Sequence, residues 1–109
     1  MGLYHKGRAV MGMMDQPFTG ERFIARPEEA IVRRQGSTRR LSTRQGVSLD
    51  QAIMMTTSPK IFSEAHEPRY KRVEDSVRLA RYGCDCYAYA MVAAGYIDLV
   101  VEADLEVLE

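Results

Sequence analysis

The chain has 109 residues, which is enough for one small domain with a single modest core. Apolar residues make up 46% of it and charged residues 28%, which is ordinary for a folded protein and gives no sign of disorder. No apolar run approaches the roughly 20 residues that cross a bilayer, and the N-terminus lacks a signal-peptide pattern, so we expect a cytoplasmic protein.

Charge is distributed unevenly along the chain, although the formal net charge is zero. Residues 1–50 carry nine Lys and Arg against five Asp and Glu, whereas residues 51–109 carry six against ten. The two halves therefore differ in sign, at +4 and −4. Such a split suits the association of two copies of the chain as well as it suits an outside partner.

The first 46 residues carry the pattern of short antiparallel strands. Apolar alternation predicts strands at residues 3–5, 9–14, 21–25, 30–33 and 40–43, with turns at Lys6-Gly7, Thr19-Gly20 and Gln35-Gly36-Ser37. We therefore expect a meander of four or five strands. Its apolar face needs a cover, and the only helical segments lie downstream, so we expect the second half of the chain to pack on it.

A basic cluster extends from Arg33 to Arg44. Its five arginines are Arg33, Arg34, Arg39, Arg40 and Arg44. One interpretation is a non-catalytic interaction module, in which this hairpin lays cations along the phosphates of a nucleic acid. The other is a solvated hairpin whose charges keep an edge strand from pairing with other chains. We favour the second, because no aromatic residue interleaves the cluster to stack on bases.

Residues 47–82 alternate between helical and strand patterns. Ser48 and Gln51 fit a capping box that opens one short helical turn. Further elements are a buried strand at 53–57 closed by Ser58-Pro59, an amphipathic helix at 67–77 with Tyr70, Val73 and Val77 on one face, and a strand at 77–82.

The stretch 81–102 completes this pattern. Gly83 lies in a break after the strand, Asp85 is expected to cap a small-residue helix over residues 86–94, and Gly95 ends it. Branched residues then predict a strand at 97–101, with Glu102 at its carboxyl end. Ligands collect at that end of a parallel sheet, so one ligand can meet both Asp85 and Glu102.

The order strand, helix, strand, helix, strand implies a largely parallel sheet with right-handed crossovers. We therefore expect a fold of the α+β or α/β class, in which an antiparallel meander precedes a βαβαβ unit. Residues 1–46 and 47–109 are expected to pack as one compact unit.

Two cysteines, Cys84 and Cys86, flank Asp85. A disulfide between them would close only a strained ring. Neither His5 nor His66 stands at metal-ligand spacing from the pair. We therefore expect both cysteines to be reduced and packed as small apolar residues.

Several separate motifs resemble one known family in the same order. They are residues 83–90, GCDCYAYA, with residues 93–103, AAGYIDLVVEA; Asp15-Gln16-Pro17 with Gly20-Glu21-Arg22; and Thr56-Thr57-Ser58-Pro59 with Phe62. This combination resembles the histidinol-phosphate phosphatase branch of the inositol monophosphatase superfamily. The resemblance covers nearly the whole chain, but only the middle of such an enzyme.

The resemblance implies a Mg²⁺-dependent hydrolase of phosphate monoesters, in which carboxylates hold the ions. Most of the family's metal ligands come from an early glutamate and an Asp-Pro-(Ile/Leu)-Asp-Gly-Thr loop, and no such string occurs in residues 1–109. A further metal-binding aspartate has its register at Glu109, and Leu108-Glu109 is either native or a cloning remnant. We therefore expect an internal fragment, natural or truncated by design, that holds no Mg²⁺ stably and is inactive alone. We also expect it to form a homodimer that buries its open sheet edges.

The resemblance also assigns a substrate-binding role to five residues. Asp85 and Glu102 belong on the alcohol side of a small phosphorylated substrate, where two carboxylates suit the ammonium group of histidinol. Gly83 and Cys84 lie beside it at the helix start, although the family usually has glycine where this chain has Cys84. Arg81 is a weaker candidate. The plain alternative is that Asp85 is only a helix cap and Glu102 only a surface charge at a strand end.

Ser58 has two interpretations under the same resemblance. The superfamily keeps a polar residue near its substrate at the end of this strand, which makes Ser58 a candidate support for the site. A serine that ends a strand by satisfying the local backbone is the interpretation we favour.

Overall fold

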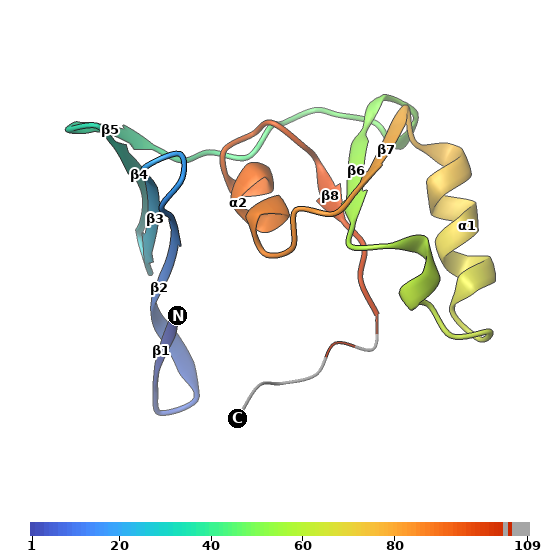
Figure 1. The fold of residues 1–109 in the computed structure, drawn as a ribbon, viewed down its shortest axis with the longest axis horizontal. Coiled ribbons are helices and arrows are strands. Elements are labelled where there is room, and N and C mark those ends of the chain that lie inside the picture. The colour runs from blue at the N-terminus through green and yellow to red at the C-terminus, as the bar shows by residue number, and fades with distance from the viewer. Residues whose placement is uncertain (104, 106–109) are drawn as a thin grey trace.

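The computed structural model describes residues 1–103 and 105 and contains two sheets and two α-helices (Figure 1). The antiparallel sheet is formed by β1 (Gly2–His5), β2 (Arg8–Gln16), β3 (Glu21–Arg26), β4 (Glu29–Arg34) and β5 (Ser37–Arg40) in sequence order. The parallel sheet is formed by β6 (Ile53–Thr56), β7 (Leu79–Tyr82) and β8 (Leu99–Val100) in the order β7-β6-β8. The helices are α1 (Glu67–Ser76) and α2 (Tyr87–Ala93), with short 3₁₀ turns η1 (Leu49–Gln51) and η2 (Pro59–Ile61). The predicted mixed fold class is therefore confirmed.

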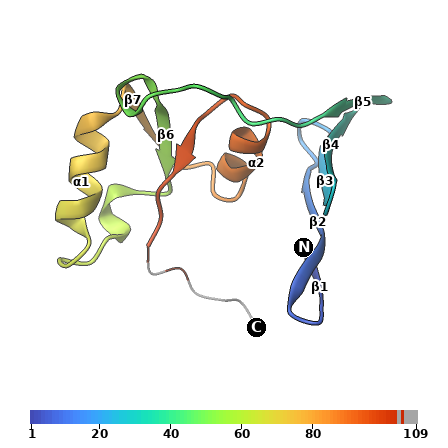
Figure 2. The same cartoon turned by 180° about the vertical axis from the view of Figure 1, so that it is seen from behind.

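These elements stack in four layers. From left to right, Figure 1 shows the antiparallel sheet, α2, the parallel sheet and α1, and the view from behind in Figure 2 shows them in the reverse order. Helix α2 therefore lies between the two sheets. The expectation that a downstream helix covers the meander is confirmed.

Small side chains allow α2 to approach both sheets closely. On one side Ala90 packs with Phe23 and Val32 of the antiparallel sheet. On the other side Ala88 packs with Met55 and Ile97 of the parallel half. Each of these six residues is at most 8% exposed. Burial of apolar area at about 25 cal/mol per Å² is the main stabilising term here, so α2 holds the two sheets together.

The fifth strand is displaced from its predicted place. It covers Ser37–Arg40, whereas the sequence pattern predicted residues 40–43. The cause is a two-residue turn at Gln35-Gly36, whose φ angles of 48° and 78° suit a tight hairpin. Arg34 therefore pairs directly with Ser37, and Leu41 already lies beyond the strand.

The predicted capping box at Ser48 is wrong. The Ser48 hydroxyl donates to Asp50 Oδ1 at 2.5 Å and accepts no bond from the helical turn that follows. Serine side chains often bond to a nearby polar group in place of capping a turn, and here that group is the Asp50 carboxylate. The short turn itself forms as expected, at Leu49–Gln51.

The segment after β5 is joined to the parallel sheet by an ion pair. Asp98, whose side chain is 8% exposed, accepts from Arg44 Nε at 2.9 Å and Arg44 Nη2 at 2.6 Å. It also accepts from the backbone N–H of Ile53 at 2.7 Å. Gly95, at the end of α2, lies against the same segment. A Cβ atom there would stand 2.9 Å from the carbonyl oxygen of Ser42.

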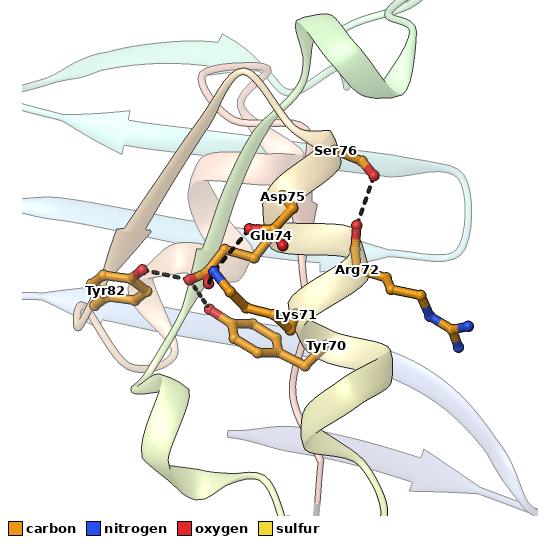
Figure 3. A network of polar contacts seen from close by, with 7 residues as sticks. All are labelled: Tyr70, Lys71, Arg72, Glu74, Asp75, Ser76 and Tyr82. Carbon is orange, nitrogen blue, oxygen red and sulfur yellow. Dashed lines mark hydrogen bonds and ion pairs between the residues drawn. The ribbon is translucent and has the colours of Figure 1, made fainter.

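A polar network fastens α1 to the parallel sheet (Figure 3). Glu74 accepts from the hydroxyl of Tyr70 at 2.6 Å, from the hydroxyl of Tyr82 at 2.5 Å and from Lys71 Nζ at 3.0 Å. These bonds, that of Tyr70 first, lower the pKa of Glu74 to about 2. Since Tyr82 ends β7, the network fixes the strand at the point where it enters the next turn.

We expect the chain to lose stability in acid through Glu74. A carboxyl group with a lowered folded-state pKa stabilises the fold above its unfolded value near 4.5, and this contribution is lost as pH falls toward about 2. Because Lys71 and Tyr82 are solvent-exposed, we expect a contribution of only about 2 kcal/mol. Urea unfolding at several pH values measures it. The slope between pH 4.5 and 2 should flatten in Glu74→Gln but persist in Glu67→Gln on the same helix. Equal slopes in the two variants would contradict the assignment.

In the part of the chain that the structure describes, no helix has the length and apolar character that crossing a membrane requires.

Candidate functional site

The candidate site lies at the carboxyl edge of the parallel sheet. Thr57 follows β6, Gly83 follows β7 and Glu102 lies two residues beyond β8. The N–H of Gly83 donates to the carbonyl oxygens of Thr56 and Thr57 at 3.0 and 3.1 Å, and the N–H of Val101 donates to Met55 O at 3.1 Å. The three chain segments that leave the sheet are therefore tied together at this edge.

Glu102 is attached to the end of the neighbouring strand. Its Oε1 atom accepts from the backbone N–H of Thr57 at 2.8 Å and from Thr57 Oγ1 at 3.0 Å. Its Oε2 atom is buried and has no hydrogen-bond partner among the described residues. Glu102 is therefore joined to the neighbouring strand end by two hydrogen bonds, and a contact between Glu102 and a ligand stays a prediction.

Asp85 does not cap the helix, contrary to the prediction. Helix α2 begins at Tyr87, its N-cap residue is Cys86, and no side chain caps it. Gly83, Cys84 and Asp85 have φ angles of 85°, 69° and 41°, so three consecutive residues are in the left-handed region. This turn leaves the side chain of Asp85 exposed, with no hydrogen bond in the described part of the chain.

Left-handed backbone at two non-glycine residues is strained, and such strain is often found at functional turns. The prediction that both cysteines pack as small apolar residues is wrong. Both Cys84 and Cys86 are free thiols, but they are exposed and not packed in the core.

The side chains of Arg81 and Ser58 each form a hydrogen bond with a nearby backbone atom. Arg81 lies on β7 opposite Met55, is exposed, and donates through Nη1 to the carbonyl oxygen of Ala80 at 2.9 Å. Ser58 Oγ accepts from the N–H of Lys60 at 3.2 Å, which is the backbone role favoured from the sequence. Glu109 lies outside the described residues.

Two residues related to Glu102, namely Thr57 and Tyr89, were not predicted from the sequence. Thr57 binds Glu102 as described above. Burial and the nearby Glu102 carboxylate raise the pKa of Tyr89, a half-exposed residue of α2. The sequence pattern placed Thr57 inside the strand predicted at 53–57, whereas β6 ends at Thr56 and leaves the N–H of Thr57 without a ladder partner.

The basic cluster is divided among several local contacts. Arg44 pairs with Asp98, and Arg40 Nη2 donates to the carbonyl oxygen of Glu28 at 3.2 Å. Arg39 lies over the ring of Tyr96, with 5.6 Å between the guanidinium carbon and the ring centroid. These contacts support the interpretation of a solvated hairpin whose arginines bond within the chain.

Residues 1–103 and 105 contain no group of three or more His, Cys, Asp or Glu side chains that could hold a metal ion. Two carboxylates, Asp85 and Glu102, approach the same edge, and Glu102 already uses one oxygen for Thr57. The described residues therefore do not fit a Mg²⁺ site.

Residues 1–107 match the sequence profile of the Inositol monophosphatase family. The chain is 43% identical over 106 residues to the bifunctional phosphatase IMPL2, chloroplastic, of Arabidopsis thaliana, covering 97% of this chain and 30% of that protein. The chain thus spans about a third of that relative's length.

Two solved structures have the same arrangement. An inositol monophosphatase from Zymomonas mobilis aligns with a TM-score of 0.84 and 32% identity, over 96% of this chain and 40% of that one. Mycobacterium tuberculosis SuhB aligns with a TM-score of 0.74 and 22% identity over 89% of this chain and 41% of that one, which supports the fold alone. The resemblance inferred from the motifs is confirmed at the level of the family, and this chain belongs to the inositol monophosphatase family.

Proposed function

We propose that this chain forms the alcohol-binding wall of a Mg²⁺-dependent phosphate-monoester hydrolase, with histidinol phosphate as the expected substrate. On its own it binds the alcohol but does not hydrolyse the ester. The observation that carries this proposal is the placement of Asp85 and Glu102 after β7 and β8, the two strands that flank β6 at one edge of the sheet. Two carboxylates at one edge suit a ligand that brings a cation and hydroxyl groups.

Gly83 and Cys84 form the turn that carries Asp85 and therefore set the position of its carboxylate. The side chain of Cys84 stands where the family usually has glycine, and it is exposed, so it narrows the approach to the backbone of this turn. Arg81 is exposed on the strand that leads into the turn. We assign it to the rim of the site, where it meets the anionic end of the substrate.

Hydrolysis in this family requires Mg²⁺, which activates water and stabilises the leaving oxygen. The described residues provide no such centre. Their contribution is to bind and orient the alcohol. The Arabidopsis relative is a bifunctional phosphatase, which is compatible with an alcohol site that accepts more than one substrate.

We also propose that the chain forms a homodimer in the cytoplasm. Met1, Leu3 and Tyr4, in and beside edge strand β1, are all more than half exposed, and the two halves of the chain have opposite net charge. Sedimentation velocity tests the dimer, and a monomer at all concentrations contradicts it. The location stays a prediction, since the Arabidopsis relative is described as chloroplastic.

The binding proposal is tested by NMR titration of the 109-residue chain with histidinol and with myo-inositol. Histidinol is expected to shift the amide resonances of residues 83–85 and 102. Asp85→Asn and Glu102→Gln are each expected to weaken binding roughly fivefold to tenfold, which corresponds to about 1–1.4 kcal/mol. Asp50→Asn, which changes a carboxylate far along the chain, serves as the control and should bind as the unmodified chain does.

A phosphatase assay with Mg²⁺ completes the test. No appreciable turnover of histidinol phosphate or inositol monophosphate is expected. Turnover that rises with Mg²⁺ and disappears in Asp85→Ala would refute the claim that the chain alone is inactive. Absence of any histidinol or inositol binding would refute the alcohol-site assignment itself.

A further inference from the structure

The two oxygens of the Glu102 carboxylate are in different environments. Both donors of Thr57, its backbone N–H and its hydroxyl, bind the same oxygen, Oε1, at 2.8 and 3.0 Å. The other oxygen, Oε2, is buried and has no partner among the described residues. A buried, unpaired carboxylate oxygen is costly and calls for an explanation, such as a catalytic role, an ion or an ordered water.

Thr57 can bind this carboxylate because it lies just beyond the end of β6. Strand β6 ends at Thr56 and β8 ends at Val100, so the N–H of Thr57 has no strand partner in the ladder. Glu102 supplies the missing acceptor from 45 residues away in the sequence. Two donors that converge on one oxygen from one residue hold the carboxylate in a single orientation, and a lone N–H would leave it free to rotate.

We propose that Thr57 is a positioning residue, which fixes the Glu102 carboxylate through Oε1 and leaves Oε2 as the oxygen without a protein partner. The ligand group that meets Oε2 must then be a hydrogen-bond donor, either a hydroxyl or an ammonium group. This inference rests on the proposed function, since it concerns the same alcohol site, and it adds the residue that orients the acceptor. Thr57 itself is exposed, so its substitution should leave the fold intact.

The first test compares Thr57→Val with Thr57→Ser by NMR titration with histidinol. Valine has nearly the shape of threonine but lacks the hydroxyl donor, and we expect it to weaken binding about fivefold. Serine keeps the donor and should bind within about twofold of the unmodified chain. Thr38→Val, at an exposed position of β5, is the matched control and should have no effect.

The second test needs no ligand. Amide hydrogen exchange at Thr57 should become at least about tenfold faster in Glu102→Ala, because the N–H loses its acceptor. Exchange at Val101, whose N–H donates to Met55 O within the same sheet, should stay unchanged.

The outcomes separate the two proposals. If the unmodified chain binds histidinol and Thr57→Val binds equally well, the positioning role is wrong and the alcohol site stands. The positioning role is also wrong if Thr57 exchanges at the same rate with and without Glu102. If the unmodified chain binds neither histidinol nor myo-inositol, the alcohol site is wrong and this inference falls with it.

Discussion

Replacement of Gly95 by alanine is expected to destabilise the chain by about 3–5 kcal/mol, the largest effect of any single methyl group that we foresee. Gly95 has a φ angle of 79°, which costs an L-residue about 1–2 kcal/mol. The added Cβ would also stand 2.9 Å from the carbonyl oxygen of Ser42 and 3.5 Å from the N atom of Arg44. Both neighbours are backbone atoms, so relief requires α2 to move away from the segment that follows β5.

Gly46→Ala is the matched control for this variant. Gly46 has a similar φ angle of 68°, but a Cβ atom there would meet nothing within 4 Å. It should therefore show only the backbone cost, about 1–2 kcal/mol. Urea unfolding followed by circular dichroism gives both values, since the chain contains no tryptophan. If the two variants are equally stable, the close approach of α2 to residues 42–44 is not present in solution.

The regular elements were largely predictable because they depend on local pattern. Helix α1 was expected at residues 67–77 and is found at Glu67–Ser76, and the strand expected at 53–57 is found at Ile53–Thr56. In both elements the spacing of apolar residues matches the period of the element. One face is therefore apolar and packs against whichever surface covers it. The cover that α2 provides for the meander was predictable for a related reason, since an apolar sheet face must be buried.

The predictions were wrong where a polar side chain has several possible hydrogen-bond partners. Ser48 was expected to cap a turn but donates to Asp50, and Asp85 was expected to cap α2 but is left exposed by the left-handed turn. Local spacing does not decide between such alternatives, because each bond has nearly the same free energy.

The candidate site was predictable only in part, for a similar reason. Parallel strand order places Asp85 and Glu102 at the same edge, and this follows from the sequence pattern. The partner of Glu102 does not, because Thr57 lies 45 residues away and meets it only where the strand ladder ends. The same holds for Arg44 and Asp98, which are 54 residues apart in the sequence.

Asp98→Ala is the second substitution with a large expected effect, a loss of about 3 kcal/mol. Burial raises the pKa of Asp98, but the hydrogen bonds from Arg44 and from the N–H of Ile53 outweigh it and lower the pKa overall. The carboxylate is thus charged and fully used. Its removal leaves the guanidinium of Arg44 and the first N–H of β6 without their acceptor. The 37% exposure of the Arg44 side chain lets water replace part of the loss, which keeps the effect at the lower end for a broken buried pair.

Two further variants separate the role of the charge from that of the contact. Asp98→Asn keeps one acceptor oxygen of similar shape and should cost about 1–2 kcal/mol. Asp15→Ala breaks an Asp–Arg pair of similar length, 2.7 Å, in which both side chains are more than 40% exposed, so it should change the urea midpoint little. If Asp98→Ala loses no more stability than Asp15→Ala does, the Arg44–Asp98 ion pair does not join the segment after β5 to the parallel sheet. The expected order of stability is Asp98→Ala lowest, Asp98→Asn next and Asp15→Ala highest. Burial separates position 98 from position 15, because the same chemical pair strengthens as water is excluded from it, and the retained acceptor oxygen separates asparagine from alanine at position 98.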